Sequence, residues 1–466
     1  MQKTYQDLLE VGEREEDRME FVQMLIRTRG DDPQYNIAKI ADQYDRHKNV
    51  TITQYQKILY TVTGKAIPDN YSANYKLASR FFNRFVVQEN QYLLGNGVTW
   101  ENSATVNKLG DDFDNKVQKL GKDALVCGTS FGFWNFDHLE AFNYLEFIPL
   151  YDEENGSLSA GVRYWQINPQ KPLRATLYEQ DGYTEYIWRN GQGEVLNEKR
   201  KYITRYVRTE ADGTIIYDGE NYPGFPIVPM FGNPHHQSEL VGLQEQIDCY
   251  DLIKSGFANT VDEASLIYWT IRNAGGMDDV DMAEFVHRIR RLHVASAMDD
   301  ADAEPHQIEA AYNSREALLD RLRSDLYEDA MALDTKSIAG GAVTATEIKA
   351  AYEPLRQKAS QFEYCVLDFL HGIMEIAGID DHPTFTPDML VNQAEEISNL
   401  VSAAEYLPGD YVTRRILTLF GDTDKVDEVL NEMSREERIS FTEPNRRNEQ
   451  PDNEPGGGLN GEEETA

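Results

Sequence analysis

The sequence predicts an α+β protein in which two helical regions flank a region of short strands. Apolar residues recur at helical spacing between charged residues up to about residue 94. From about residue 124 to residue 231, short runs rich in β-branched and aromatic residues alternate apolar with polar side chains. Helical periodicity returns at residue 238 and continues to about residue 433. The length of 466 residues is sufficient for about three domains.

Two amphipathic helical stretches are predicted before the strands. The first carries apolar residues from Leu8 to Ile26, and the second runs from Tyr75 to Leu94. The second stretch leads into Gly95-Asn96-Gly97, where a glycine can adopt the left-handed backbone that ends a helix. We therefore expect a helix over residues 75–94.

The strand region is predicted to be an antiparallel meander. Its strands are separated by residue pairs that favour positive φ at a hairpin turn, so consecutive strands fold back on each other. These pairs are Asn155-Gly156, Asp181-Gly182, Asn190-Gly191 and Asp212-Gly213. The run over 221–234 then holds four prolines, which interrupt regular structure before the next helix.

Three helices are predicted in the second half from apolar residues at helical spacing. One begins at Ser238 and ends near Asp262, a second covers 314–333, and a third covers 346–377. Between the first two, residues 265–276 are predicted as a strand and turn. Residues 299–307, DDADAEPHQ, are predicted as a loop.

Two segments are predicted to lack regular structure. The segment DTKSIAGGAVTA, 334–345, is predicted to be a loop because its small, glycine-paired composition does not sustain a helix. Residues 436–466 contain few apolar side chains to offset the entropy of ordering, so we expect a disordered acidic tail.

The composition excludes several classes of protein. The chain has 80 acidic and 45 basic residues, so its formal net charge is −35. Proteins that clamp nucleic acid by its phosphates present clustered Lys and Arg, so this charge leaves only local or weak DNA contact. The three cysteines are widely spaced, which argues against a disulfide framework or a thiolate zinc site. No apolar run approaches the ~18 residues of a membrane span and no signal peptide is evident, so we expect a soluble, unexported protein.

One motif resembles that of a serine hydrolase. Residues 128–132, Gly-Thr-Ser-Phe-Gly, match the G-x-S-x-G pattern, in which a strand precedes the serine and a helix follows it. The residues that follow here are aromatic and strand-like, so a structural role for the glycines is favoured. The alternative is a soluble serine hydrolase that uses Ser130 with His138 or His235.

Metal and phosphate sites are not predicted. His235-His236 and the pair His287 and His293 lack the spacing of a zinc site. Three acidic clusters, at 111–114, 278–281 and 299–302, lack the glycine and terminal Glu of a calcium loop, and no phosphate-binding loop is present. We expect no catalytic residue, no metal and no cofactor.

Three segments together resemble one protein family. Residues 83–98, NRFVVQENQYLLGNGV, are similar to an early family helix that ends in a Tyr-Leu-Leu-Gly turn, and 123–136 are similar to a strand entry with paired glycines. Residues 233–263 are similar to a run with Ser-Glu-Leu, Ile-Asp-x-Tyr-Asp, Ser255 and Asn259. Over most of 20–435 the sequence thus resembles the portal (connector) proteins of tailed bacteriophages, of the long non-contractile-tail (siphophage) type.

The resemblance implies an elongated subunit with an α/β wing, two stem helices, a small mixed clip, a tunnel loop followed by a long helix, and a helical crown. The implied boundaries are 1–237 for the wing, 238–263 for stem helix 1, 264–311 for the clip, 312–333 for stem helix 2, 334–345 for the tunnel loop, 346–378 for the long wing helix and 379–435 for the crown, with 436–466 as the tail.

The resemblance also implies a function that is not enzymatic. Such proteins form a ring, usually a dodecamer, at one capsid vertex of the virion, and the ring is the channel for genome packaging and ejection. The implied partners are further copies of the chain, double-stranded DNA held weakly and non-specifically, the terminase large subunit, a head-completion or adaptor protein, and capsid and scaffolding proteins. No membrane is involved, and assembly takes place in the host cytoplasm. In the clip, Arg288, Arg290 and Arg291 are candidates for partner binding; a salt-bridged helix face is the favoured alternative for this basic cluster.

The tunnel loop is the segment expected to face DNA. Lys336 is the only cation in 334–345 and is expected to touch the DNA backbone; an ion pair with a neighbouring subunit is the alternative. An acidic channel suits sliding, because each neutralised phosphate adds salt-sensitive affinity. The residues expected to face DNA are Thr335, Lys336, Ser337, Ile338, Gly340, Gly341, Val343 and Thr344.

Overall fold

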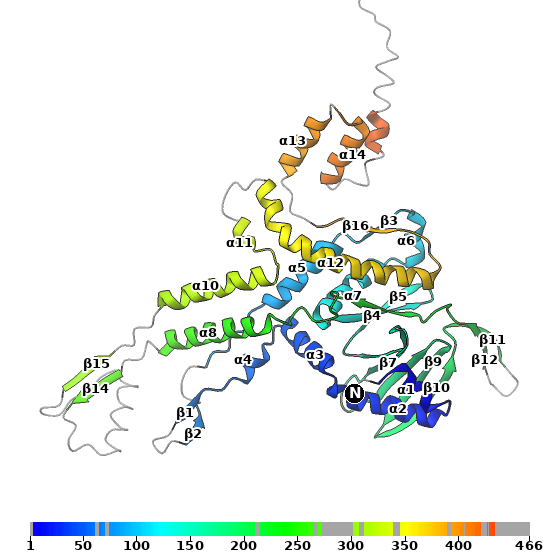
Figure 1. The fold of residues 1–466 in the computed structure, drawn as a ribbon, viewed down its shortest axis with the longest axis horizontal. Helices are drawn as coiled ribbons and strands as arrows, with labels where there is room; N and C mark the ends of the chain where they lie inside the picture. Colours follow the sequence, from blue (N-terminus) through cyan, green and yellow to red (C-terminus); the bar gives the residue numbers. More distant parts are fainter. Residues whose placement is uncertain are drawn as a thin grey trace, which may run out of the picture. The chain divides into compact units, whose positions relative to one another are not determined.

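The computed structural model describes residues 3–60, 65–69, 74–209, 215–263, 268–272, 302–306, 312–338, 345–388, 393–404, 406–420, 426 and 428–433. The chain divides into two units (Figure 1). The first comprises Met1–Gly341 and Lys349–Met389, and the second comprises Ala342–Ile348 and Leu390–Ala466. Both helices and strands form most of the first unit, which confirms the predicted α+β class.

The N-terminal helices form as the sequence predicts. Helix α1 begins with a capping box, in which Thr4 and Asp7 each bond the other's backbone N–H, and α3 begins after the capping residue Asp32 with proline in its first turn. The helices are α1 (Tyr5–Val11), α2 (Glu15–Thr28), the 3₁₀ turn η1 (Arg29–Asp31), α3 (Pro33–Asp45) and α4 (Val50–Gln54). Phe21, Val22 and Leu25 of α2 pack into an apolar cluster with residues of the main sheet.

The main sheet is the predicted antiparallel meander, with strand order β10-β9-β8-β7-β6. Its turns use the expected glycines, since Gly156, Gly182 and Gly191 all have positive φ. Asp212-Gly213 lies outside the described residues. The strands are β6 (Phe147–Tyr151), β7 (Leu158–Trp165), β8 (Leu173–Glu179), β9 (Gly182–Arg189) and β10 (Gln192–Arg200), followed by a separate hairpin of β11 (Ile203–Thr209) and β12 (Ile215–Glu220).

A second core lies where helices pack on a smaller sheet. This sheet has the order β13-β4-β5, and its strands are β4 (Thr129–Asn135), β5 (His138–Asn143) and β13 (Ile227–Phe231). Helices α5 (Phe81–Leu94), α7 (Phe113–Cys127) and α12 (Ala345–Ala377) contribute the buried aromatic and aliphatic side chains around it. A Cβ built on Gly132 would lie 2.5 Å from the Phe369 ring, so this glycine lets α12 approach β4.

Two long helices pack against each other beside this core. They are α8 (Gln244–Glu263) and α10 (Tyr312–Asp329), and they run antiparallel, because Gln246 bonds Asp329 at one end while Arg315 bonds Thr260 at the other. The chain between them contributes a pair of antiparallel strands, β14 (Tyr268–Arg272) and β15 (Asp302–His306). After α10 comes the short helix α11 (Thr335–Ile338).

The remaining elements are short. In the first unit they are the hairpin of β1 (Ile58–Tyr60) and β2 (Ala66–Pro68), β3 (Val98–Trp100), α6 (Ser103–Leu109) and β16 (Pro383–Phe385), which pairs with β3. The second unit contains α13 (Gln393–Ala403) and α14 (Gly409–Phe420). No helix in the described part of the chain is both long and apolar enough to cross a bilayer.

Several predicted boundaries in the first unit are wrong. Residues 75–80 are not helical, and α5 begins at Phe81. Helix α8 begins at Gln244 rather than Ser238, because Gly242 has φ +87° and a turn comes first. Helix α10 ends at Asp329 rather than Leu333, because Met331 has φ +51°.

Two segments predicted as loops contain regular structure. Residues 302–306 form strand β15 because they find a partner in β14, which a local pattern does not reveal. Thr335–Ile338 form one helical turn, α11, so the prediction that no part of 334–345 is helical is wrong. The backbone N–H of Lys336 donates to Asp334 at 3.0 Å, which caps this turn.

The G-x-S-x-G motif is structural. Helix α7 precedes Ser130 and strand β4 contains it, the reverse of the strand-then-helix order that a nucleophile elbow requires. Ser130 is fully buried, and its hydroxyl donates to the backbone carbonyl of Leu120 at 2.8 Å. His138 pairs with Asn135 at the far end of the hairpin, whereas Ser130 pairs with Asn143. The arrangement of a serine hydrolase is therefore contradicted.

Replacement of Ser130 by alanine tests this structural role. We expect Ser130→Ala to lower the free energy of unfolding by about 1 kcal/mol, because the buried hydrogen bond from Ser130 to the Leu120 carbonyl is lost. Denaturant unfolding of the purified variant measures this change, and Ser324→Ala, at an exposed position on α10, is the control. Labelling of native Ser130 by a serine-directed probe would contradict the structural assignment.

Candidate functional site

A segment of five residues, 75–79, is held on one face of helix α8 by its backbone. The side chain of Asn259 accepts the backbone N–H of Tyr75 at 2.7 Å, Ser255 accepts that of Leu77 at 3.0 Å, and Asp251 accepts that of Ser79 at 2.9 Å. All three acceptors are buried. The amides of alternate residues thus meet side chains four residues apart on the helix, and we call this set of bonds the α8 ladder.

The α8 ladder works because two repeat distances nearly match. Four residues of α-helix rise by about 6.0 Å, and two residues of extended chain advance by about 6.6 Å. Alternate amides can therefore meet successive Asp251, Ser255 and Asn259 only if the segment over 75–79 is nearly extended. This explains why apolar residues that predict a helix from Tyr75 do not form one.

The same helix also holds the end of α3 and the start of α4. Asp248 accepts hydrogen bonds from the hydroxyls of Tyr44 and Thr51, the second at 2.8 Å. Asn49 donates to Asp251 at 2.8 Å and caps α4 by accepting the backbone N–H of Ile52 at 3.0 Å. Burial raises the pKa of the Asp251 carboxyl, although its hydrogen bonds from Ser79 and Asn49 oppose that rise.

A buried ion cluster joins α12 to two other elements. The ammonium of Lys358 lies 2.8 Å from Glu89 of α5 and 2.7 Å from Glu239 of the turn before α8. Burial raises the pKa of Glu89 to about 7, because desolvation outweighs the attraction of Lys358. Burial alone would lower the pKa of Lys358, but the two carboxylates raise it above its ordinary value. Asn233 also donates to Glu239 at 2.8 Å.

A second ion pair fixes the start of the predicted tunnel loop. The guanidinium of Arg323 contacts both carboxylate oxygens of Asp334, at 2.8 and 2.6 Å. It also lies 4.8 Å from the centre of the Tyr327 ring. These contacts fix the position of the chain just after α10. Lys336, the second residue of α11, is exposed. Hydrogen bonds from Arg323 lower the pKa of the Asp334 carboxyl.

The structure describes only part of the predicted site. Of the residues expected to face DNA, Thr335, Lys336, Ser337 and Ile338 form α11. Gly340, Gly341, Val343 and Thr344 lie outside the described residues, as do the clip candidates Arg288, Arg290 and Arg291.

In the sequence, the residues of the α8 ladder stand out only as part of a family resemblance, which gives them no role. A signal for that role exists, because Asp251, Ser255 and Asn259 form a polar stripe at i, i+4 and i+8 on an otherwise amphipathic helix. Such a stripe indicates a buried polar partner for the helix. It does not identify which segment supplies that partner.

Comparison with known proteins identifies the family. The family model described as "Phage portal protein, SPP1 Gp6-like" matches residues 36–440. The chain belongs to this portal protein family. The match includes α8 and the residues of its ladder. Members of this family are structural virion components rather than catalysts, which agrees with the buried, bonded state of Ser130.

Two phage portal proteins show the extent of the similarity. The portal protein of Clostridium phage phiCD119 is 22% identical over 344 residues, covering 67% of this chain and 73% of the relative. The portal protein of Bacillus phage SPP1 is 24% identical over 337 residues, and the match covers 67% of this chain and 64% of that relative. The match therefore spans less than two thirds of the SPP1 protein.

Solved structures of particles contain similar chains at low identity. A chain of the native gene transfer agent virion has a TM-score of 0.43 and 11% identity, with coverage of 72% of this chain and 89% of the other. A chain of the neck of the empty gene transfer agent particle, computed with C6 symmetry, has a TM-score of 0.41 and 10% identity, with coverage of 73% and 90%.

The α8 ladder predicts a pattern of amide hydrogen exchange. We expect the amides of Tyr75, Leu77 and Ser79 to exchange slowly and those of Lys76 and Ala78 to exchange fast, because only the first set donates to α8. Residue-resolved hydrogen exchange measures the pattern.

Two variants test the ladder bond by bond. Asn259→Ala is expected to release the Tyr75 amide, and Ser255→Ala the Leu77 amide, each without loss of protection at Ser79. Cys249→Ala, on the exposed face of α8, is the control and leaves the pattern unchanged. Equal exchange at all positions of 75–79 in the unmodified protein would contradict the ladder.

The buried cluster predicts how stability depends on pH. The folded chain binds the Glu89 proton more tightly than the unfolded chain, because the pKa of Glu89 rises from 4.5 to about 7 on folding. Stability from this group is therefore full below pH 4.5 and is lost as pH rises through 7, by about 3 kcal/mol at most.

Glu89→Gln is the variant that isolates this effect. We expect it to be more stable than the unmodified protein at pH 8 and close to it at pH 5, since a neutral amide removes the titration and keeps the shape. Denaturant unfolding at both pH values measures the difference. Glu353→Gln, at an exposed ion pair on α12, is the control that leaves the pH 5 to pH 8 difference unchanged. A Glu89→Gln protein that is less stable at both values would contradict the prediction.

Proposed function

We propose that this portal protein forms a ring, a dodecamer in keeping with the family, at one capsid vertex, and that the ring is the channel for packaging and ejecting double-stranded DNA. The observation that carries the proposal is the family match over 36–440, which spans the α8 and α10 helix pair and the loop after it. Residues 238–263 and 312–333 then act as stem helices, 334–345 as tunnel loop and 346–378 as the long wing helix. Residues 1–237 form the wing and 379–435 the crown.

The proposal assigns the partners by position. The clip, 264–311, is the surface for the terminase large subunit and later for a head-completion or adaptor protein, with Arg288, Arg290 and Arg291 as candidate contacts. The wing and crown face capsid and scaffolding proteins. Assembly takes place in the host cytoplasm, and the acidic tail, 436–466, extends from the crown.

The charge of the chain supports a channel through which DNA slides. Each phosphate that a protein neutralises adds affinity that must be broken for movement, and a net charge of −35 keeps such contacts few. Lys336 supplies one positive charge where the tunnel loop begins, and Asp334, already paired with Arg323, is not available to neutralise it fully.

The first test is the mass and shape of the purified full-length protein. Light scattering and negative-stain imaging are expected to give rings with a central hole and close to twelve subunits. A monomer or dimer that persists at high concentration would contradict ring formation.

The second test concerns the tunnel loop. Deletion of residues 339–344 is expected to leave rings intact and to abolish DNA packaging, because the shortened loop no longer reaches the DNA. Packaging into procapsids assembled with the variant measures the effect. A matched deletion of residues 461–466 at the end of the tail is the control. Normal packaging by rings that carry the shortened loop would exclude the tunnel-loop assignment.

A further inference from the structure

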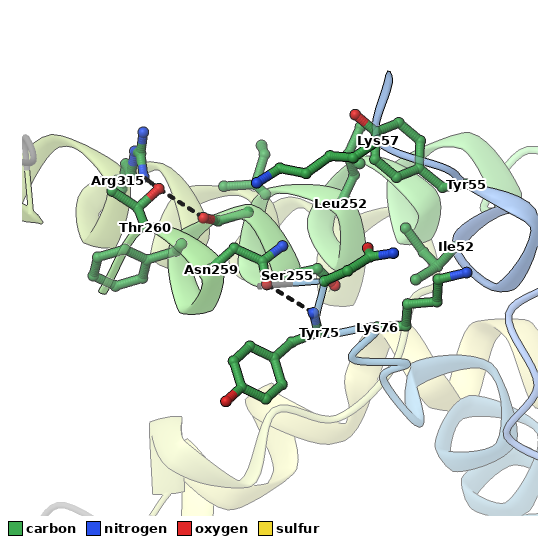
Figure 2. Close-up of a pocket in the computed structure, with 14 residues that line it drawn as sticks. Ile52, Tyr55, Lys57, Tyr75, Lys76, Leu252, Ser255, Asn259, Thr260 and Arg315 are labelled. Atoms are coloured by element: carbon green, nitrogen blue, oxygen red, sulfur yellow. Dashed lines mark hydrogen bonds between the residues drawn. The ribbon is translucent and has the colours of Figure 1, made fainter. Parts of the chain in front are cut away.

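A pocket lies beside the α8 ladder, on the exposed side of the helix. Its volume is about 420 Å³, and residues of α4, the segment that follows it, the segment held by the ladder, α8 and α10 surround it (Figure 2). Apolar groups supplied by Ile52, Tyr55, Leu252 and Phe257 form part of its wall. The ladder residues Ser255 and Asn259 form another part, so the hydrogen bonds that hold the segment also hold the shape of the pocket.

The charge of this pocket is opposite to that of the protein. Lys57, Lys76 and Arg315 line it, and no Asp or Glu is among the lining residues that the structure describes. The whole chain has 80 acidic against 45 basic residues. The ammonium of Lys76 donates to the backbone carbonyl of Thr53, and Arg315 donates to the hydroxyl of Thr260, so both charges are held in place by neutral groups. The pocket is therefore complementary to an anionic group.

Within the described part of the chain, no contact of Gly256 in the wall of the pocket requires a glycine. It lies inside α8, where glycine costs roughly 1 kcal/mol relative to alanine. Its φ is not positive, and a Cβ built on it would meet no atom within 4 Å. The absence of a side chain here is explained if another backbone approaches α8 closely at this position.

Large apolar side chains are exposed around the same pocket. Tyr55, Tyr75 and Leu252 line it and remain 48%, 51% and 43% exposed. A second hollow, which shares Tyr75 and Phe257 with this pocket, carries the exposed Val261 and is lined by both Lys254 and Asp262. Exposed apolar groups that surround a hollow are typical of a surface that another chain covers.

We propose that this pocket receives an acidic segment with apolar side chains from a second copy of the chain, and that the contact centres on Gly256, Lys76 and Arg315. The inference rests on the proposed ring and names the surface through which neighbouring copies recognise each other. A second copy fits because every copy carries a large excess of carboxylates, whereas Lys76 and Arg315 are held here by neutral groups. A ring needs such a heterologous contact, in which a surface on one copy meets a different surface on the next.

Two variants test the contact by size and by charge. Gly256→Leu places a side chain in the pocket wall, where its Cβ would meet no described atom within 4 Å, and Lys76→Glu with Arg315→Glu reverses the charge of the pocket. We expect each to raise the concentration needed for half-maximal ring formation at least tenfold, as measured by mass photometry or sedimentation velocity. The controls are Gly30→Leu, at an exposed glycine with no atom within 4 Å of its Cβ, and Lys171→Glu, at an exposed loop. Both controls are expected to form rings like the unmodified protein.

A second measurement keeps the test independent of folding. A photo-crosslinking amino acid at Leu252, in rings mixed from ¹⁴N- and ¹⁵N-labelled protein, is expected to join peptides of the two labels and to capture an acidic segment. Thermal unfolding and the exchange pattern at Tyr75 and Leu77 confirm that each variant keeps the pocket wall.

The outcomes separate the two proposals. Rings at unchanged concentration from both pocket variants, or crosslinks within one label only, would overturn the inference and leave the ring proposal standing. Failure of the unmodified protein to form rings at any concentration would overturn the proposed function itself.

Discussion

Helix α8 fixes the arrangement of the first unit through a match of two repeats. Four residues along a helix and two along an extended chain cover nearly the same distance, so Asp251, Ser255 and Asn259 can each take one amide of the neighbouring segment. The backbone of residues 75–79 lies against a helix, so no neighbouring strand can accept hydrogen bonds from its amides. A buried amide without an acceptor costs free energy. The ladder therefore makes it possible to bury one side of residues 75–79 against α8.

The ion cluster around Lys358 links helix α12 to α5 and to the turn before α8. A buried charge without partners costs several kcal/mol, so Lys358 specifies one register in which Glu89 and Glu239 both lie within 3 Å. Glu89 comes from α5, which begins directly after the segment held by the ladder, and Glu239 comes from the turn before α8. The position of α12 on the small sheet is thus tied to the same helix. Gly132 then permits the close contact of Phe369 with β4.

The sequence predicts helices and strands well wherever interactions between residues close in the chain determine them. The meander between 147 and 200 was predictable because its Asn-Gly and Asp-Gly turns and alternating strands agree with each other. The helix over 345–377 was predictable because its apolar stripe continues without a break, even past Pro354. The predictions fail where contacts with residues distant in the sequence determine the local structure. Residues 75–80 carry a helical pattern but give their amides to α8, and residues 302–306 look like a loop but pair with β14.

The candidate site was less predictable than the fold for the same reason. The resemblance identified Ser255 and Asn259, and the stripe they form with Asp251 is visible in the sequence, but their partners are almost two hundred residues away. The cluster of Lys358 with Glu89 and Glu239 spans an even longer stretch and has no local pattern at all. Pairing of distant charges depends on the packing of whole helices, which a single sequence does not specify.

A net charge of −35 and self-association are compatible because the two effects act at different ranges. At 0.1 M salt the Debye length is about 10 Å, so the repulsion between the acidic surfaces of two copies decays within that distance. Contacts inside a partly enclosed pocket are screened less, so in the proposed contact Lys76 and Arg315 would act at full strength only once a carboxylate had entered. The same range limits the repulsion of DNA phosphates to a thin layer. In the proposed channel, an acidic wall would keep a polyanion off its surface without opposing its passage along the axis.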